Sequence, residues 1–170
     1  MRYASIRSMD ISNGRGVGVS LFVQGCHFHC KNCFNSDTWD FNGGKEWTKE
    51  VKNNFFKLIA RPYINHISIL GGEPLCKENI VEVTNLAKEC KMSFPNKKIW
   101  LWSGYDFKKY INQLEITYYI DYIIDGQYID ELKDKDLIFK GSSNQKIWKK
   151  ENNIWIEWEE LNGTVNNKTV

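Results

Sequence analysis

Short apolar runs alternate along the chain with segments of helical character. The runs at residues 18–24, 66–70, 98–102, 122–124 and 137–139 are bounded by glycine or other turn-forming residues, which predicts five strands. Between them we expect helices at residues 48–60, 78–92 and 106–114. In the first two of these segments the apolar side chains recur at helical spacing. Strands that alternate with helices are typical of a parallel sheet covered by helices.

The pattern predicts an α/β fold, and within that class a partial (open) βα barrel of about five to six mostly parallel strands with helices outside. So few strands cannot close an eight-stranded barrel. We expect residues 1–150 to form this single domain. In the tail, residues 151–170, apolar side chains alternate at Ile154, Ile156 and Trp158, which predicts an extra strand, and the chain from Asn162 is expected to be frayed.

Composition narrows the class of protein. The chain has 170 residues, of which 42% are hydrophobic and 26% charged, as in a soluble globular domain. Lys and Arg number 23 against 21 Asp and Glu, so a nucleic acid is not the expected partner. No apolar run approaches the roughly 20 residues of a membrane span, and the first residues lack the apolar stretch of a secretory signal. We therefore expect a cytoplasmic protein that does not bind membranes.

Three of the five cysteines lie close together. Cys26, Cys30 and Cys33 follow the predicted strand at residues 18–24 with C-x3-C-x2-C spacing, whereas Cys76 and Cys90 are scattered and are expected to be structural. An odd number of cysteines is a poor disulfide framework, so the cluster indicates metal binding. One alternative is a tetrahedral zinc site completed by one of the two neighbouring histidines, His27 or His29. The other is an iron–sulfur cluster in which one iron lacks a protein ligand. The spacing favours the second.

A second motif, Gly71-Gly72-Glu73-Pro74, ends the next predicted strand. Two glycines allow positive φ angles and a close approach of the backbone to a ligand, and Pro74 fixes the turn. Taken alone, the tetrapeptide is more often a plain turn. Because the polar segments all follow the carboxyl ends of strands, where parallel α/β folds bind ligands, we expect them to converge on one rim.

The cysteine motif followed by Gly71-Gly72-Glu73-Pro74 resembles the radical S-adenosylmethionine (SAM) enzymes, whose barrel is of the partial type predicted above. The resemblance covers roughly residues 3–145. Within that superfamily, the sequence resembles in particular the activases of glycyl-radical enzymes that act on the anaerobic (class III) ribonucleotide reductase. The segments that carry this narrower resemblance are residues 10–16, 21–26, 33–39, 100–105, 125–126 and 141–145.

The resemblance implies a mechanism. Cys26, Cys30 and Cys33 would hold a [4Fe–4S] cluster whose open iron binds SAM. An external one-electron donor, of the flavodoxin type, would reduce it. SAM would then be cleaved to methionine and a 5′-deoxyadenosyl radical that abstracts a glycine Cα hydrogen on the reductase. No catalytic residue is implied beyond the cluster and SAM. The residues implied to bind the cofactor are Asn32, Cys33, Phe34, Gly71, Gly72, Glu73, Ser103 and Asp125.

One position departs from the superfamily pattern. Many members carry an aromatic residue just before the third cysteine, beside the adenine, but here that residue is Asn32 and the aromatic residue is Phe34. We therefore expect the adenine contact to come from the backbone of residues 32–34 and the Phe34 ring. Ser103 and Asp125 follow later strands and could contact the ribose or the carboxylate of SAM, although each alone is more often a turn residue.

Other functions remain open at this stage. The nearest is an activase of another glycyl-radical enzyme, such as pyruvate formate-lyase, or a small radical SAM synthase. A non-catalytic Cys3His zinc-binding module would leave Gly71-Gly72-Glu73-Pro74 unexplained, and a pure electron carrier would hold a cluster without cleaving SAM. The glycine-rich segment at residues 13–18 precedes a strand, so it does not match a dinucleotide-binding loop. We expect it to be a flexible lip beside the active site.

Overall fold

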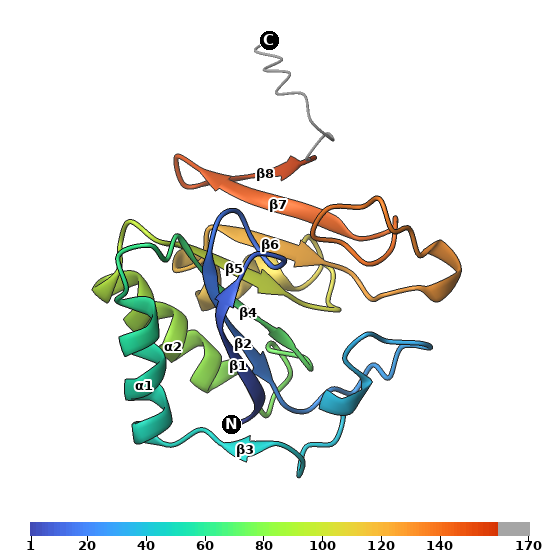
Figure 1. The fold of residues 1–170 in the computed structure, drawn as a ribbon. Coiled ribbons are helices and arrows are strands. Elements are labelled where there is room, and N and C mark those ends of the chain that lie inside the picture. Colours follow the sequence, from blue (N-terminus) through green and yellow to red (C-terminus); the bar gives the residue numbers. More distant parts are fainter. Residues whose placement is uncertain (160–170) are drawn as a thin grey trace.

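A single mixed sheet organises the protein. The computed structural model describes residues 1–159, and in this part of the chain eight strands lie in the order β3-β1-β2-β4-β5-β6-β7-β8 (Figure 1). The strands are β1 (Arg2–Asp10), β2 (Gly18–Val23), β3 (Lys45–Glu46), β4 (His66–Gly71), β5 (Lys98–Trp102), β6 (Tyr122–Asp125), β7 (Lys146–Glu151) and β8 (Ile154–Trp158). Four of these strands match runs that the sequence predicts, and β8 matches the extra strand predicted in the tail.

The centre of the sheet is parallel and its two sides are antiparallel. Strands β2, β4, β5 and β6 pair in parallel, with Val19 opposite Ile67 and Ile67 opposite Ile99. The pairs β1–β2, β1–β3, β6–β7 and β7–β8 are antiparallel. The expectation of five to six mostly parallel strands is therefore wrong. The sequence pattern predicts the buried parallel centre, because its strands are nearly continuous apolar runs. It underestimates the number of antiparallel strands at the two sides of the sheet.

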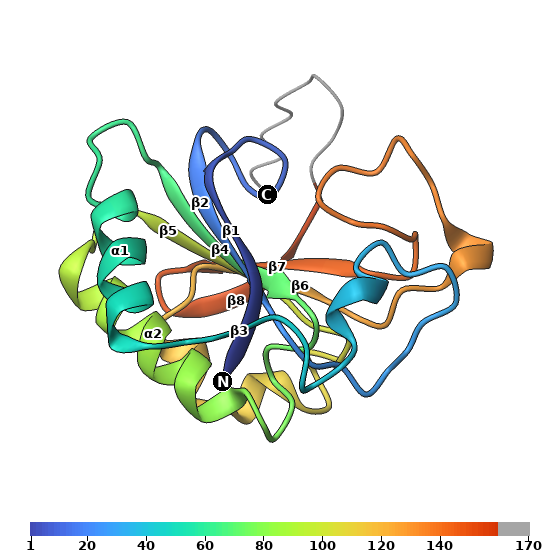
Figure 2. The same ribbon diagram turned by 60° about the horizontal axis from the view of Figure 1, so that its bottom comes forward.

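Both α-helices of the described part of the chain lie on the same side of the sheet (Figure 2). Helix α1 (Lys49–Ile59) begins after Thr48, whose side chain accepts a hydrogen bond from Val51 N, as an N-cap residue does. Helix α2 (Ile80–Ser93) buries Leu86, Ala87 and other apolar side chains. These two helices and one face of the sheet enclose the main hydrophobic core. None of the helices within residues 1–159 could span a membrane.

Two predicted elements are absent. Residues 106–114 form turns and a short 3-10 helix, η2 (Ile111–Gln113), followed by η3 (Glu115–Tyr118), instead of a third α-helix. Residues 137–139 are not a strand. They belong to a long connection between β6 and β7, which also contains the 3-10 helix η4 (Asp130–Leu132). Another short 3-10 helix, η1 (Ser36–Thr38), follows the clustered cysteines. The fraying expected from Asn162 onward lies outside the described residues.

The opposite face of the sheet carries a second, aromatic core. Trp100 and Tyr122 stack with their ring centroids 3.9 Å apart, and Trp158 of β8 packs edge-on against both. Phe139 and Trp102 extend this cluster toward the carboxyl end of β5. Because side chains alternate between the faces of a strand, Trp100 and Trp102 share the face opposite the helices. This face therefore leads directly to the site described next.

Candidate functional site

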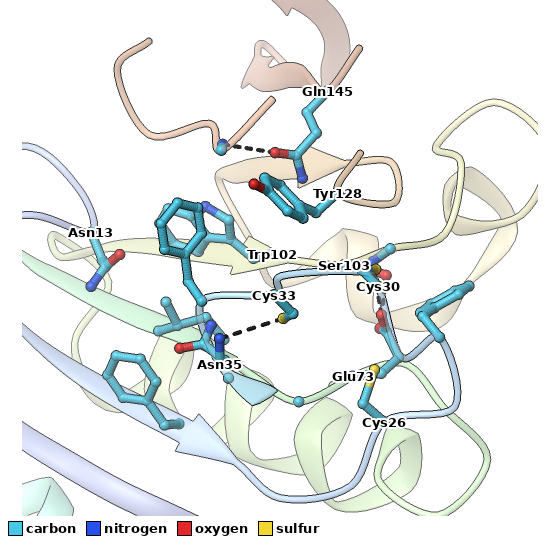
Figure 3. Close-up of a pocket in the computed structure, with 18 of the residues that line it drawn as sticks. Asn13, Cys26, Cys30, Cys33, Asn35, Glu73, Trp102, Ser103, Tyr128 and Gln145 are labelled. Carbon is cyan, nitrogen blue, oxygen red and sulfur yellow. Dashed lines mark hydrogen bonds between the residues drawn. The ribbon is translucent and has the colours of Figure 1, made fainter. Parts of the chain in front are cut away.

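A cavity of about 390 Å³ opens at the carboxyl ends of the parallel strands. All three clustered cysteines line it, together with Gly71, Gly72, Glu73 and Ser103 (Figure 3). The predicted convergence of the cysteine segment, the double-glycine turn and the end of β5 on one rim is thus confirmed. Cys76 and Cys90 are buried elsewhere and do not line the cavity.

The three thiols present a set of soft ligands along one wall of the cavity. Cys26 lies three residues after the end of β2 and is buried, whereas Cys30 and Cys33 are half-buried. The Cys33 Sγ accepts a hydrogen bond from Asn35 N at 3.4 Å. Burial raises the pKa of Cys26 and of Cys30 above that of an ordinary thiol. A bound metal would therefore have to displace the protons from both thiols.

The two glycines of the second motif pack against the backbone that leads into Cys26. Gly71 has a φ of +107°, and a Cβ at Gly72 would lie 2.4 Å from Gly25 O. Gly72 N donates to Val23 O at 2.9 Å, and Glu73 N donates to Gly25 O at 2.8 Å. The sequence suggested that the two glycines let a ligand approach the backbone closely. In the structure, the segment that they let approach is residues 23–25 of the same chain. As a consequence, the turn after β4 holds the backbone next to Cys26 in place.

The Glu73 carboxylate joins two turns of the cavity wall. It is buried, and its Oε1 accepts hydrogen bonds from Leu75 N (2.9 Å) and Ser103 Oγ (2.8 Å). Its Oε2 accepts a hydrogen bond from Gly104 N (2.7 Å). Burial raises the pKa of this carboxyl group to about 7, against the lowering effect of the three donors. Glu73 and Ser103, selected separately from the sequence, are therefore direct partners.

The neighbouring histidines, His27 and His29, line a different hollow, which they share with Cys26. His27 Nε2 lies 3.1 Å from each carboxylate oxygen of Glu78, and the His29 ring stacks on Trp39 with centroids 4.7 Å apart. Neither histidine lines the cavity that holds the three thiols. Within residues 1–159, no three His, Cys, Asp or Glu side chains gather closely enough to hold a single metal ion. The donors that surround the cavity are thus three thiols without an imidazole.

Comparison with known proteins places the chain. Residues 12–148 match the family model described as a 4Fe-4S single cluster domain. An anaerobic ribonucleoside-triphosphate reductase-activating protein of Enterobacteria phage T4 is 39% identical over 155 residues, which cover 91% of this chain and 98% of the relative. Proteins of the same name from Salmonella typhi and Escherichia coli K12 are 37% and 34% identical and each cover 86% of this chain and 97% of their own length.

The chain belongs to the family of anaerobic ribonucleoside-triphosphate reductase-activating proteins. The matched segment of the 4Fe-4S model contains the three cysteines and both turns joined by Glu73. We therefore expect the function of this chain within the family to depend on the cavity.

Two of the predicted cofactor-binding residues do not line the cavity. Asp125 is buried behind it, and its Oδ2 accepts a hydrogen bond from Phe107 N at 2.6 Å, which is the role of a satisfied turn residue. Asn32 is exposed, has a φ of +53° and donates from Nδ2 to Asp130 Oδ2 at 2.6 Å. Phe34 lines the cavity and contacts the Tyr128 ring edge-on, with centroids 5.4 Å apart. The aromatic surface at this point thus comes from Phe34 and Tyr128.

The loop between β1 and β2 lines the far end of the cavity through Asn13 (Figure 3). We expected a flexible lip, but hydrogen bonds tie this loop down. Asp10 accepts from Ser12 N, Asn13 N and Asn13 Nδ2, and Ser68 Oγ donates to Asn13 O. His66 Nδ1 lies 3.0 Å from Arg15 O. The sequence reasoning also missed Trp102 as a lining residue, although it directly precedes Ser103 at the end of a predicted strand.

Burial of Glu73 predicts a pH dependence of stability. Its pKa is raised from 4.5 to about 7 in the folded protein, so the folded state binds this proton more tightly than the unfolded state. The free energy of unfolding of the iron-free protein should therefore fall as pH rises through this window, by about 3 kcal/mol from this group. Denaturant unfolding at several pH values would measure it. The Glu73→Gln variant should lack this component, and parallel curves for both proteins would contradict the prediction.

Proposed function

We propose that this chain activates the anaerobic ribonucleoside-triphosphate reductase by radical SAM chemistry. The observation that carries the proposal is a single cavity that brings three cysteine thiols and the Gly71-Gly72-Glu73 turn together. The protein would be a radical SAM oxidoreductase located in the cytoplasm. Membership of the reductase-activating family, and the match to a 4Fe-4S domain, support this choice of partner and cofactor.

Cys26, Cys30 and Cys33 would hold a [4Fe–4S] cluster. They fit it because thiolates are the usual ligands of such clusters, and three of them leave one iron without a protein ligand. When bound, the cluster would pass one electron from an external donor to SAM, which yields methionine and a 5′-deoxyadenosyl radical that takes a hydrogen atom from a glycine Cα to give 5′-deoxyadenosine. A flavodoxin-type protein would be that donor.

The chain's own residues would position SAM and exclude water. Gly71, Gly72 and Glu73 lie on the cavity wall next to Cys26, and Cys33 and Phe34 lie on the wall that would face the adenine. Glu73 already accepts three hydrogen bonds, so its part would be to hold the turn and Ser103 in place. Phe28, Leu70 and Trp102 add an apolar lining that keeps a reactive radical away from solvent.

The cofactor-binding set is smaller than the sequence predicts. Asp125 is left out, because its carboxylate is used by Phe107 N and does not line the cavity. The side chain of Asn32 is also left out, because it is bonded to Asp130. The backbone of residues 32–34 stays in the proposal as a contact for the adenine.

The competing function of a Cys3His zinc module has less support. His27 is paired with Glu78 and His29 is stacked on Trp39, so either ring would have to leave a partner and turn into the cavity to complete a tetrahedral site. The double-glycine turn and its Glu73 bridge would also have no part in such a module.

The choice of partner is tested by radical transfer. Anaerobically reconstituted protein, mixed with SAM, a reductant and the anaerobic reductase, should produce a glycyl radical signal on the reductase in electron paramagnetic resonance. Pyruvate formate-lyase, offered in a parallel reaction, should give none. A signal on the lyase and none on the reductase would contradict the proposed partner while leaving the SAM chemistry in place.

A further inference from the structure

The connection between β6 and β7, residues 126–145, forms one wall of the cavity. Gly126, Tyr128, Lys140 and Gln145 of this connection all line it. The connection lies against the cysteine segment, and residues of both segments line the cavity (Figure 3).

Polar side chains of one short turn in this connection anchor it to the cysteine segment. Asp130 accepts hydrogen bonds from Asn32 Nδ2 at 2.6 Å and from Tyr128 Oη at 2.9 Å. Glu131 Oε1 pairs with Lys31 Nζ at 2.9 Å. Both acidic residues of the turn are therefore directed to the chain around the third cysteine.

The apolar side chains of the same turn face the solvent. Ile129 is 39% exposed and Leu132 is 42% exposed, and η4 contains no buried residue. These two side chains, which we call the rim patch, add little to either core. Ile129 directly follows Tyr128, which lines the cavity, so the rim patch lies beside the cavity.

Phe34 of the cysteine segment adds exposed apolar surface beside the rim patch at the cavity mouth. It is 65% exposed, and it contacts the two residues that flank the rim patch, with the Tyr128 ring 5.4 Å away and Lys133 Nζ 4.9 Å from the Phe34 ring. Lys140 also lines the cavity and forms no ion pair within residues 1–159. The mouth thus combines exposed apolar side chains with two lysines.

We infer that the rim patch, Ile129 and Leu132, docks the polypeptide segment of the reductase that carries the target glycine. The inference rests on the proposed function. A glycine within a polypeptide reaches the cavity only if the residues on either side of it lie across the mouth. The exposed apolar side chains and the lysines there favour a segment with apolar residues and an acidic side chain near the glycine.

The test separates SAM cleavage from radical transfer. The double variant Ile129→Ser/Leu132→Ser should yield at least about tenfold less glycyl radical on the reductase at subsaturating reductase, because truncated interface anchors commonly cost this much affinity. Its formation of 5′-deoxyadenosine from SAM without reductase should stay within about twofold of the unsubstituted protein, because both positions are exposed. Binding of the reductase, measured by calorimetry, should weaken in parallel.

A matched control comes from α2. Val81→Ser/Met92→Ser removes two apolar side chains that are 70% and 74% exposed and do not line the cavity, and it should leave radical transfer unchanged. The conservative variant Leu132→Met should retain radical transfer. Unchanged radical yield and reductase affinity in the rim-patch variant would overturn the inference. An equal loss in both double variants would also overturn it, whereas no 5′-deoxyadenosine from the unsubstituted protein would overturn the proposed function itself.

Discussion

Replacing Cys30 by alanine should abolish formation of 5′-deoxyadenosine from SAM, with at least about a 100-fold loss, because removing a direct metal ligand does more harm than removing its supporting partners. Cys26→Ala and Cys33→Ala should behave in the same way. All three thiols line the cavity, and none is paired in a disulfide. The measurement is 5′-deoxyadenosine per chain after anaerobic reconstitution with iron and sulfide.

Cys90→Ala is the matched control for these variants. Cys90 is buried in α2 within the main core and does not line the cavity. Its replacement should retain SAM cleavage and lower the free energy of unfolding by only about 1 kcal/mol, as expected for a small loss of buried volume. A Cys30→Ala protein that still cleaves SAM would contradict the assignment of the ligands.

The second large effect is expected at Glu73. Glu73→Ala should lower the free energy of unfolding by about 3 kcal/mol, because Leu75 N, Gly104 N and Ser103 Oγ lose their acceptor in a buried site. The loss separates the turn after β4 from the end of β5. Denaturant unfolding of the iron-free protein at about pH 5.5, below the folded-state pKa of about 7, measures this loss without the cost of burying the ionised carboxylate.

Glu50→Ala offers a comparison in which a carboxylate is removed from an exposed position. Glu50 lies in the first turn of α1, where its loss should change stability by no more than about 0.5 kcal/mol. If Glu73→Ala were as mild as Glu50→Ala, the three hydrogen bonds to Glu73 would not hold the cavity wall together, and its role as a bridge would be wrong.

The sequence predicts the centre of the fold and the centre of the site for the same physical reason. The four central strands, β2, β4, β5 and β6, are buried on both faces, so each is a nearly continuous apolar run in the sequence. Each run is followed by a polar or glycine-containing segment. The cysteine motif then begins three residues after β2, and the double glycine begins at the last residue of β4. Their convergence follows from parallel pairing alone.

The sides of the sheet could not be predicted in this way. Strand β1 is mostly half-exposed or exposed, and four of the six residues of β7 are charged, so neither shows the apolar run of a central strand. The run at residues 137–139 looks like a strand in isolation, yet Phe139 adopts a φ of +63° and packs against Trp100. Tertiary packing determines the conformation of these segments, and the local sequence pattern carries little information about that packing.

Asp125 does not line the cavity, whereas Tyr128 of the connection after β6 does. An aspartate at a strand end is a plausible ligand by topology, but nothing in the sequence shows that Phe107 N will occupy its carboxylate. Tyr128 and Asp130 contact the cysteine segment across about a hundred residues of chain. Contacts of that separation leave no signal in a single sequence.

The most direct test of the account measures metal, sulfide and product in one anaerobic sample. We predict about four irons and four sulfides per chain, and 5′-deoxyadenosine that forms only when both SAM and a reductant are present. About one zinc per chain without sulfide, or a full cluster that never yields 5′-deoxyadenosine, would contradict the claim that three thiols hold a cluster with an iron open to SAM.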